Sequence, residues 1–248
     1  MVVNPLWIGG SIGVVLSGAF VYWEVGRYAA PQVPASLFDE RKEVIAYTVG
    51  LFLGVVLSIP FGLFLTSLAD GPLVWAIVGL AILLAGFELA QRLLLRTQYF
   101  GSGQSGPFYA IGFRTGAAAI LVLTLTSLYL GTSSVDATGV VALLLESGAI
   151  VGLSAAGALM SVAPTTSATG TRGGPLSSLL LTGVGFFLLG LGQLFGPFLG
   201  GLAAALILIM SLRIYQRLRE SVLGSIRPPG VAPKPEPGTP SPFGRTDR

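Results

Sequence analysis

The chain has 248 residues, of which 52% are hydrophobic and 10% are charged, with 14 basic and 11 acidic side chains. Soluble domains carry roughly 25% charged residues, so this composition excludes a soluble enzyme and indicates that most of the surface faces lipid. The sequence contains no Cys and no His, which excludes disulfides, cysteine or histidine zinc sites, and nucleophilic catalysis that needs a histidine base.

Seven stretches are apolar and long enough to cross a bilayer as helices. A membrane helix needs about 20 mostly apolar residues, because the hydrocarbon core holds no water to satisfy an open backbone. In chain order, the predicted spans are residues 6–23, 44–69, 72–90, 108–130, 139–162, 176–195 and 198–215. The sequence therefore predicts an all-α fold, a polytopic transmembrane helix bundle with seven spans.

The last two spans come from one uncharged run, residues 176–212. As a single helix, this run would be about 55 Å long at a rise of 1.5 Å per residue, nearly twice the hydrocarbon thickness. Gly196 and Pro197 lie at its middle, and a glycine before a proline is a natural helix stop. We therefore predict two helices here.

Basic residues predict the orientation, because Lys and Arg in short loops stay on the cytoplasmic side. With seven spans, all 14 Lys and Arg fall at or near one side, whereas the turns of the opposite side hold Asp70 and Asp136. Joining the last two spans would separate the C-terminal bases from the others. The sequence thus predicts a multi-pass protein of the cell membrane with its N-terminus outside and its C-terminus in the cytoplasm.

Two segments differ in composition. Residues 1–223 form the predicted seven-helix domain, and residues 224–248 form a cytoplasmic tail that holds seven of the 16 prolines, which is typical of disorder. Within the domain, spans one to three and spans five to seven share a rhythm of one span, an inner loop and a tight hairpin. This rhythm is consistent with a 3+1+3 parallel repeat in which span four is the connector.

Glycines recur at a spacing of four residues within several spans. In lipid this spacing lets helix backbones approach closely, so that van der Waals contact holds the helices together. We expect the glycines to pack the chain's own helices against one another and not to form a homodimer seam. The pattern occurs at Gly9 and Gly13, Gly50 and Gly54, Gly148 and Gly152, and Gly192, Gly196 and Gly200.

One acid lies deep within a span. Glu146 is seven residues into the fifth span, about 10 Å below its outer boundary, where an ionised carboxylate costs about 2.5 to 3.5 kcal/mol or more. Thr124 and Ser127 on the fourth span and Gln193 on the sixth lie at similar depth. The sequence indicates either a coupling or ligand-binding acid, or a neutral acid that ties helices together.

Charged residues also lie near the inner ends of the spans. Glu88 can pair with Arg92 in the favourable acid-first i,i+4 order, or with Arg114 on the fourth span. Either pair predicts a structural clasp, with a gating role as the alternative.

Two further groups of charges belong to the span ends. Arg213, Arg217 and Arg219 extend the seventh span, and we expect them to contact anionic lipid headgroups at the inner face or a cytoplasmic partner. Asp70 and Asp136 lie in outer turns, where Asp is common for backbone reasons. Their alternative role is an intramembrane aspartyl pair.

The polar content of the spans decides the expected function. A carrier should line its path with amide, hydroxyl or charged side chains, and these spans hold few of them. The first expectation is therefore a non-enzymatic structural or accessory subunit without a cofactor, which contacts the lipid bilayer and other membrane protein subunits and no nucleic acid. The alternative is a small proton-coupled carrier that uses Glu146, which requires a water-accessible cavity at that residue. An intramembrane enzyme is a more distant alternative.

Overall fold

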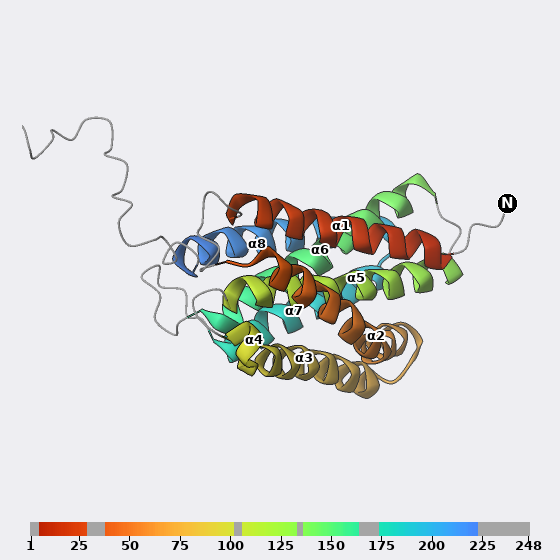
Figure 1. Cartoon of the computed structure of the whole chain (residues 1–248). Coiled ribbons are helices and arrows are strands. Elements are labelled where there is room, and N and C mark those ends of the chain that lie inside the picture. Colours follow the sequence, from red (N-terminus) through yellow and green to blue (C-terminus); the bar gives the residue numbers. More distant parts are fainter. Residues whose placement is uncertain (1–4, 29–37, 102–105, 133–135, 164–173, 223–248) are drawn as a thin grey trace, which may run out of the picture.

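The computed structural model describes residues 5–28, 38–101, 106–132, 136–163 and 174–222 (Figure 1). These residues form helices and no strands, as predicted. Within the described residues, seven helices are long and apolar enough to cross a membrane, as expected of a multi-pass membrane protein. The predicted tail, residues 224–248, lies outside the described part of the chain.

The spanning helices coincide with the predicted spans. Several of them extend further at one end, because hydropathy detects the apolar run and not the helical turns that continue into charged sequence. The four-residue α4 was not predicted, since so short a helix has no periodic pattern. In chain order the helices are α1 (Pro5–Tyr28), α2 (Glu40–Asp70), α3 (Leu73–Arg96), α4 (Gln98–Gly101), α5 (Gly106–Thr132), α6 (Ala137–Val162), α7 (Pro175–Leu194) and α8 (Pro197–Val222).

The uncharged run near the C-terminus is divided where the sequence predicted. Helix α7 ends just before Gly196, which has a φ of 88°, a conformation that glycine adopts without strain. Helix α8 then begins at Pro197, whose missing N–H would have no partner in the first helical turn. The two helices consequently form a hairpin and pack against each other.

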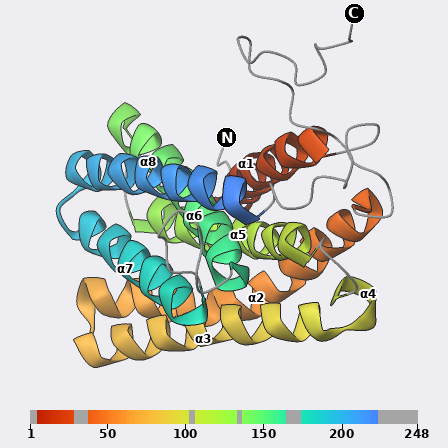
Figure 2. The same ribbon diagram turned by 90° about the vertical axis from the view of Figure 1, so that its left-hand side faces the viewer.

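Helices α5 and α6 form the centre of the bundle. Figure 2 shows them between α1 and α8 on one side and α2 and α3 on the other. Most of α5 and α6 is buried, whereas less than half of each other spanning helix is. The outer helices expose large apolar side chains such as Phe52, Trp75 and Leu202. An apolar exterior of this kind suits contact with lipid.

Glycines bring the outer helices into backbone contact with the central ones. A Cβ atom on Gly13 of α1 would lie 2.2 Å from the carbonyl oxygen of Ala119 on α5. On Gly50 of α2, it would lie 2.0 Å from the carbonyl oxygen of Phe113, also on α5. On Gly152 of α6, it would lie 2.5 Å from a side-chain atom of α8, the hydroxyl oxygen of Ser211. The small-residue pattern therefore packs helices within the chain, as predicted.

Helices α1 and α8 end on the left in Figure 1, and basic side chains lie at this end of the bundle. Arg219 Nε, at the end of α8, lies 2.9 Å from Glu24 Oε1, at the end of α1. Lys42 Nζ, at the start of α2, lies 4.9 Å from the centre of the Tyr99 ring, which follows α3. The first contact joins the end of α1 to the end of α8, and the second joins the start of α2 to α4; we term this the basic end.

The opposite end carries acidic side chains. The α2–α3 turn, the start of α6 and the α7–α8 turn meet there around one pocket, to which Asp70 and Asp136 contribute. No Lys or Arg of the described residues lines this pocket. We term this the acidic end. Acids occur at both ends, since Asp39, Glu40 and Glu43 lie at the start of α2, whereas the Lys and Arg of the described residues all lie in the halves of their helices nearer the basic end.

The packing does not support the predicted 3+1+3 repeat. Helix α6 contacts both α7 and α8, whereas α1 packs on α5 and α6 and makes no comparable contact with α2 or α3 in the described residues. The two triplets are therefore assembled differently. Helices that are joined by a tight turn are neighbours, as in the α2–α3 and α7–α8 pairs. The long loop after α1 does not determine which helix α1 packs against.

Candidate binding pocket and the polar network beneath it

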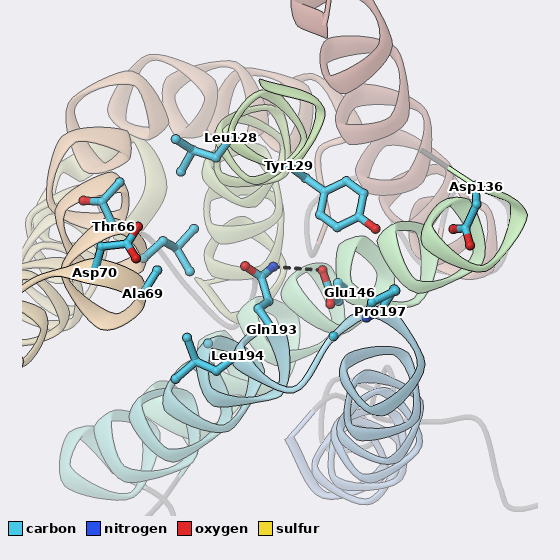
Figure 3. Close-up of a pocket in the computed structure, with 13 residues that line it drawn as sticks. Thr66, Ala69, Asp70, Leu128, Tyr129, Asp136, Glu146, Gln193, Leu194 and Pro197 are labelled. Atoms are coloured by element: carbon cyan, nitrogen blue, oxygen red, sulfur yellow. Dashed lines mark hydrogen bonds between the residues drawn. The ribbon is translucent and has the colours of Figure 1, made fainter. Parts of the chain in front are cut away.

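A pocket opens at the acidic end of the bundle (Figure 3). Its volume is about 630 Å³, within the range of about 300–1,000 Å³ that is typical of small-molecule sites. Helices α2, α5, α6 and α7 form its walls, together with the α7–α8 turn. Segments between Leu65 and Pro197 in the sequence therefore contribute to one concave surface.

Glu146 lies at the bottom of this pocket. It is about 14 Å from the start of α6 at 1.5 Å per residue, and only 4% of it is exposed. Nε2 of Gln193 on α7 donates a hydrogen bond to Glu146 Oε2, with a length of 3.0 Å. No Lys or Arg in the described part of the chain forms an ion pair with this carboxylate. The pairing of Glu146 with Gln193 agrees with their predicted depth.

Carboxylates also line the pocket on either side of Glu146 (Figure 3). Asp136 caps α6, because its Oδ1 accepts a 2.7 Å hydrogen bond from the N–H of Gly139. Asp70 is exposed at the end of α2. Both acids therefore have the turn and cap positions expected for backbone reasons. With Glu146 they give the pocket three carboxylates, a set that attracts cations.

Thr124 and Ser127, the other two candidate residues at this depth, do not line the pocket. The Thr124 hydroxyl donates to the carbonyl of Ile120 on its own helix, and its methyl group faces Gly62 of α2. The Ser127 hydroxyl is buried without a hydrogen-bond partner among the described residues. Depth along a helix does not fix the direction in which a side chain points, and here Tyr129 is the polar residue of α5 that faces the pocket.

An apolar layer closes the pocket beneath Glu146. The rings of Phe61 on α2 and Phe186 on α7 have centroids 5.7 Å apart. Together with Leu125, Ile150 and Leu189 they surround a residual space of about 10 Å³. A space of this size barely reaches the minimum of about 10–15 Å³ for one water molecule. The layer therefore separates the pocket from the interior below it.

Arg114 of α5 is the centre of a buried polar network beyond this layer. Its side chain is 1% exposed and forms an ion pair with Glu88 of α3 through Nη2. Its Nε donates to Gln91 Oε1, also on α3, and its Nη1 donates to Ser178 Oγ on α7 at 3.2 Å. Each guanidinium nitrogen thus has a partner, which a buried cation requires.

The partners of Arg114 are themselves held in place. Ser161 Oγ on α6 donates to Glu88 Oε2 at 2.8 Å. Gln91 Nε2 and Ser178 Oγ donate to backbone carbonyls of α6 at 3.3 and 2.9 Å. The network therefore ties α3, α5, α6 and α7 together at one level of the bundle.

The structure selects between the two predicted partners of Glu88. Arg92 is exposed and forms no ion pair with the described residues, whereas Arg114 pairs with Glu88 in the interior. A hydrated arginine gains little from an ion pair, but a buried one depends on it. Gly157 of α6 leaves the room for this contact, because a Cβ atom there would lie 2.8 Å from Arg114 Nη1.

A separate polar cluster joins α1 to α8 at the basic end. The Tyr215 hydroxyl donates a hydrogen bond to Glu24 Oε1, the same oxygen that faces Arg219. The Arg219 guanidinium also lies 5.7 Å from the centre of the Trp23 ring, a cation–π distance. This cluster links the first spanning helix to the last.

The three arginines predicted to contact lipid differ in their surroundings. Arg213 and Arg217 are exposed at the end of α8, where they are free to approach headgroups, but Arg219 is bound to α1. Glu24 was not identified from the sequence as the partner of Arg219. It lies just beyond the predicted first span, and the apolar run that defined this span gave no sign that α1 continues through it.

Gln91, Ser161 and Ser178 were not predicted as members of a site. Hydroxyl groups inside apolar helices usually bond to their own backbone, so nothing in the pattern marked these two serines as partners of a charge. No family model matches the chain, and no curated protein or solved structure matches it either. The candidate site is therefore defined by its geometry.

Proposed function

We propose that this chain is a small multi-pass carrier in which Glu146 is the coupling or ligand-binding group. The observation that supports this proposal is the pocket of about 630 Å³ that reaches Glu146. A cavity at this residue is what a carrier needs and a purely structural subunit does not. Glu146 and Gln193 lie at this pocket, and Glu88, Gln91 and Arg114 form the network beneath it.

The proposed orientation places the acidic end outside the cell membrane and the basic end in the cytoplasm. It is supported by the charge separation, since Lys and Arg are retained on the cytoplasmic side of short loops. In this orientation the pocket faces outward. The Arg114 network then lies between the pocket and the cytoplasm.

Single cysteines test the orientation cleanly, because the sequence contains no Cys. Thr138→Cys at the start of α6 is expected to react with a membrane-impermeant maleimide in intact cells. Arg217→Cys at the end of α8 is expected to react only after permeabilisation. Both positions are exposed, so burial does not explain a difference. Labelling of Arg217→Cys in intact cells would overturn the proposed orientation.

The closed side of the pocket suggests the mechanism. A carrier opens its site to one side while a barrier closes the other. Here the pocket is open at the acidic end, and the apolar layer and the Arg114 network lie beneath it. We interpret this arrangement as the outward-open state, with the network as the inner closure.

Breaking the network is expected to shift the carrier toward an inward-open state. The reporters are Leu194→Cys on the pocket wall and Ser154→Cys, a conservative change between the apolar layer and the network. Glu88→Gln should raise cytoplasmic labelling of Ser154→Cys roughly tenfold and reduce outer labelling of Leu194→Cys, because it weakens only the closed inner side. Arg92→Gln, on the same helix but exposed, should change neither. Unchanged labelling in a folded Glu88→Gln protein would contradict the gating role.

A structural or accessory subunit is the second candidate. The exposed Arg213 and Arg217 favour it, because they provide a cationic surface for anionic headgroups or for a partner. Purification of the tagged full chain in mild detergent separates the two candidates. A stoichiometric companion protein would support the subunit, and a monodisperse chain that transports on its own would support the carrier.

A further inference from the structure

We infer that the pocket binds a small organic cation and that Glu146 exchanges this cation for a proton. The inference rests on the proposed carrier function and adds to it the class of substrate and the direction of coupling. Three features of the pocket carry it: the uncompensated charge of Glu146, the signs of the surrounding groups, and the size and polarity of the walls.

Glu146 differs from the two acids of the ion pairs. Glu88 is paired with Arg114, and Glu24 is paired with Arg219. Glu146 is more than nine-tenths buried and points into the pocket, yet its hydrogen bond comes from the neutral amide of Gln193. A buried carboxylate needs a compensating positive charge or a proton. A cationic ligand bound in the pocket can supply this positive charge.

The groups that face Glu146 do not supply the missing charge. Asp70 faces the pocket from α2, Tyr129 from α5 and Asp136 from α6, while α7 adds only the neutral Gln193. Helix α8 approaches Glu146 through Gly200, which has no side chain. These groups are acidic or neutral, so their combined field favours a cation over an anion.

The walls favour an organic cation over a metal ion. The pocket is far larger than a bare ion, and Leu65, Leu128 and Leu194 give it apolar surface. Among the described residues, no group of three Asp or Glu is arranged to hold a metal. The ring of Tyr129 provides a further face on which an ammonium group can rest. An ammonium with a small apolar body matches both kinds of surface.

We derive the exchange from two features: Glu146 is the one buried carboxylate among the three that line the pocket, and an apolar layer lies below it. While the site changes sides and is closed to water, Glu146 has to be neutral, because an ionised carboxylate in the membrane costs about 2.5 to 3.5 kcal/mol or more. A proton and an organic cation each neutralise it, and one carboxylate does not hold both. Each monovalent cation that is carried inward is therefore exchanged for one proton that is carried outward, and the cycle moves no net charge.

Choline and its uncharged analogue dimethylbutanol form a matched pair of probes, because carbon replaces nitrogen in otherwise the same shape. Choline has no proton to release and crosses lipid slowly.

The purified full chain is reconstituted in vesicles with a pH-sensitive dye in an acidic lumen. External choline is expected to make the lumen more alkaline, whereas dimethylbutanol is not. A tenfold rise in external proton concentration should weaken apparent choline affinity by up to about tenfold, because both ligands compete for one site.

Substitutions assign the exchange to Glu146. Glu146→Gln should lower choline-driven proton release at least about tenfold, because an amide binds neither ligand as a counter-charge. Glu40→Gln makes the same chemical change at an exposed acid of the basic end and should leave the rate unchanged. Glu146→Asp keeps the charge on a shorter side chain and should still bind choline, measured as protection of Leu194→Cys from maleimide.

Several outcomes would overturn the inference. These are equal responses to choline and dimethylbutanol, choline binding without proton release, or wild-type exchange by a folded Glu146→Gln protein. After any of these results, the accessibility of Leu194→Cys and Ser154→Cys is measured in the otherwise unchanged protein. If it still alternates between the two sides, the protein still behaves as a carrier and only the cation exchange is refuted. If accessibility does not alternate either, both proposals fall.

Discussion

Replacement of Arg114 by Met is expected to lower the free energy of unfolding by about 3–5 kcal/mol, which is the usual cost of breaking a buried ion pair. The change removes the positive partner of Glu88 and leaves this carboxylate in the interior with the Ser161 hydroxyl bond. It also removes the donors to Gln91 and Ser178. Reversible unfolding of the purified protein in mixed micelles measures the difference.

A double-mutant cycle isolates the ion pair from the loss of packing. Glu88→Leu alone should be destabilising for the reciprocal reason, since it leaves a buried guanidinium. The combination of Arg114→Met with Glu88→Leu should recover a large part of the loss, because no uncompensated charge then remains. Arg92→Met changes an exposed arginine on α3, the helix that carries Glu88, and its free energy of unfolding should stay within about 0.5 kcal/mol of wild type. Simple additivity of the two buried substitutions would argue against a coupled pair.

The second large effect is expected at Gly50, in the seam between α2 and α5. In Gly50→Ala the new Cβ would lie 2.0 Å from the carbonyl oxygen of Phe113, so the helix axes have to move apart. Gly116 meets the backbone of Tyr47 in the same seam, which leaves no direction for an easy adjustment. We expect a loss of about 3 kcal/mol or more, at the upper end for overpacked cores.

Gly10→Ala is the matched control for this substitution. Gly10 lies within α1, and a Cβ atom at this position would meet no atom of another helix within 4 Å, so the change adds a methyl group without a collision. Because alanine is the better helix former, Gly10→Ala should be neutral or stabilising by up to about 1 kcal/mol. Melting temperature and the fraction of folded protein on size exclusion report both variants. Equal behaviour of the two proteins would show that the seam yields more easily than its distances indicate.

The sequence predicted which segments are helices but not how they are arranged around one another. Apolar runs and the Gly196–Pro197 break located all seven spanning helices. In a soluble bundle a polar face would also have shown which side points outward. Here the lipid-facing and core-facing sides are both apolar, so periodicity does not separate them. The glycine pairs indicated contact faces, but not that α5 is the shared partner of α1 and α2.

The candidate site was predictable only where charge was involved. Glu146 and Arg114 stood out because charged groups in apolar spans are costly and need a reason to be there. Their partners depended on helix rotation. Gln193 faces Glu146, whereas Thr124, at a similar depth, bonds to its own helix. The pocket itself is a property of the assembled helices, and no local pattern in the sequence records it.

The link between Glu24 and the last helix bears on how the protein is made. Tyr215 lies 191 positions further along the chain than the acid to which it donates. Since synthesis proceeds from the N-terminus, α1 reaches the bilayer well before Tyr215 and Arg219 have been translated. During that interval, headgroups and water have to solvate the Glu24 carboxylate. When α8 is inserted, Tyr215 and Arg219 replace these contacts, so the end of α1 reaches its final surroundings only after α8 has been made.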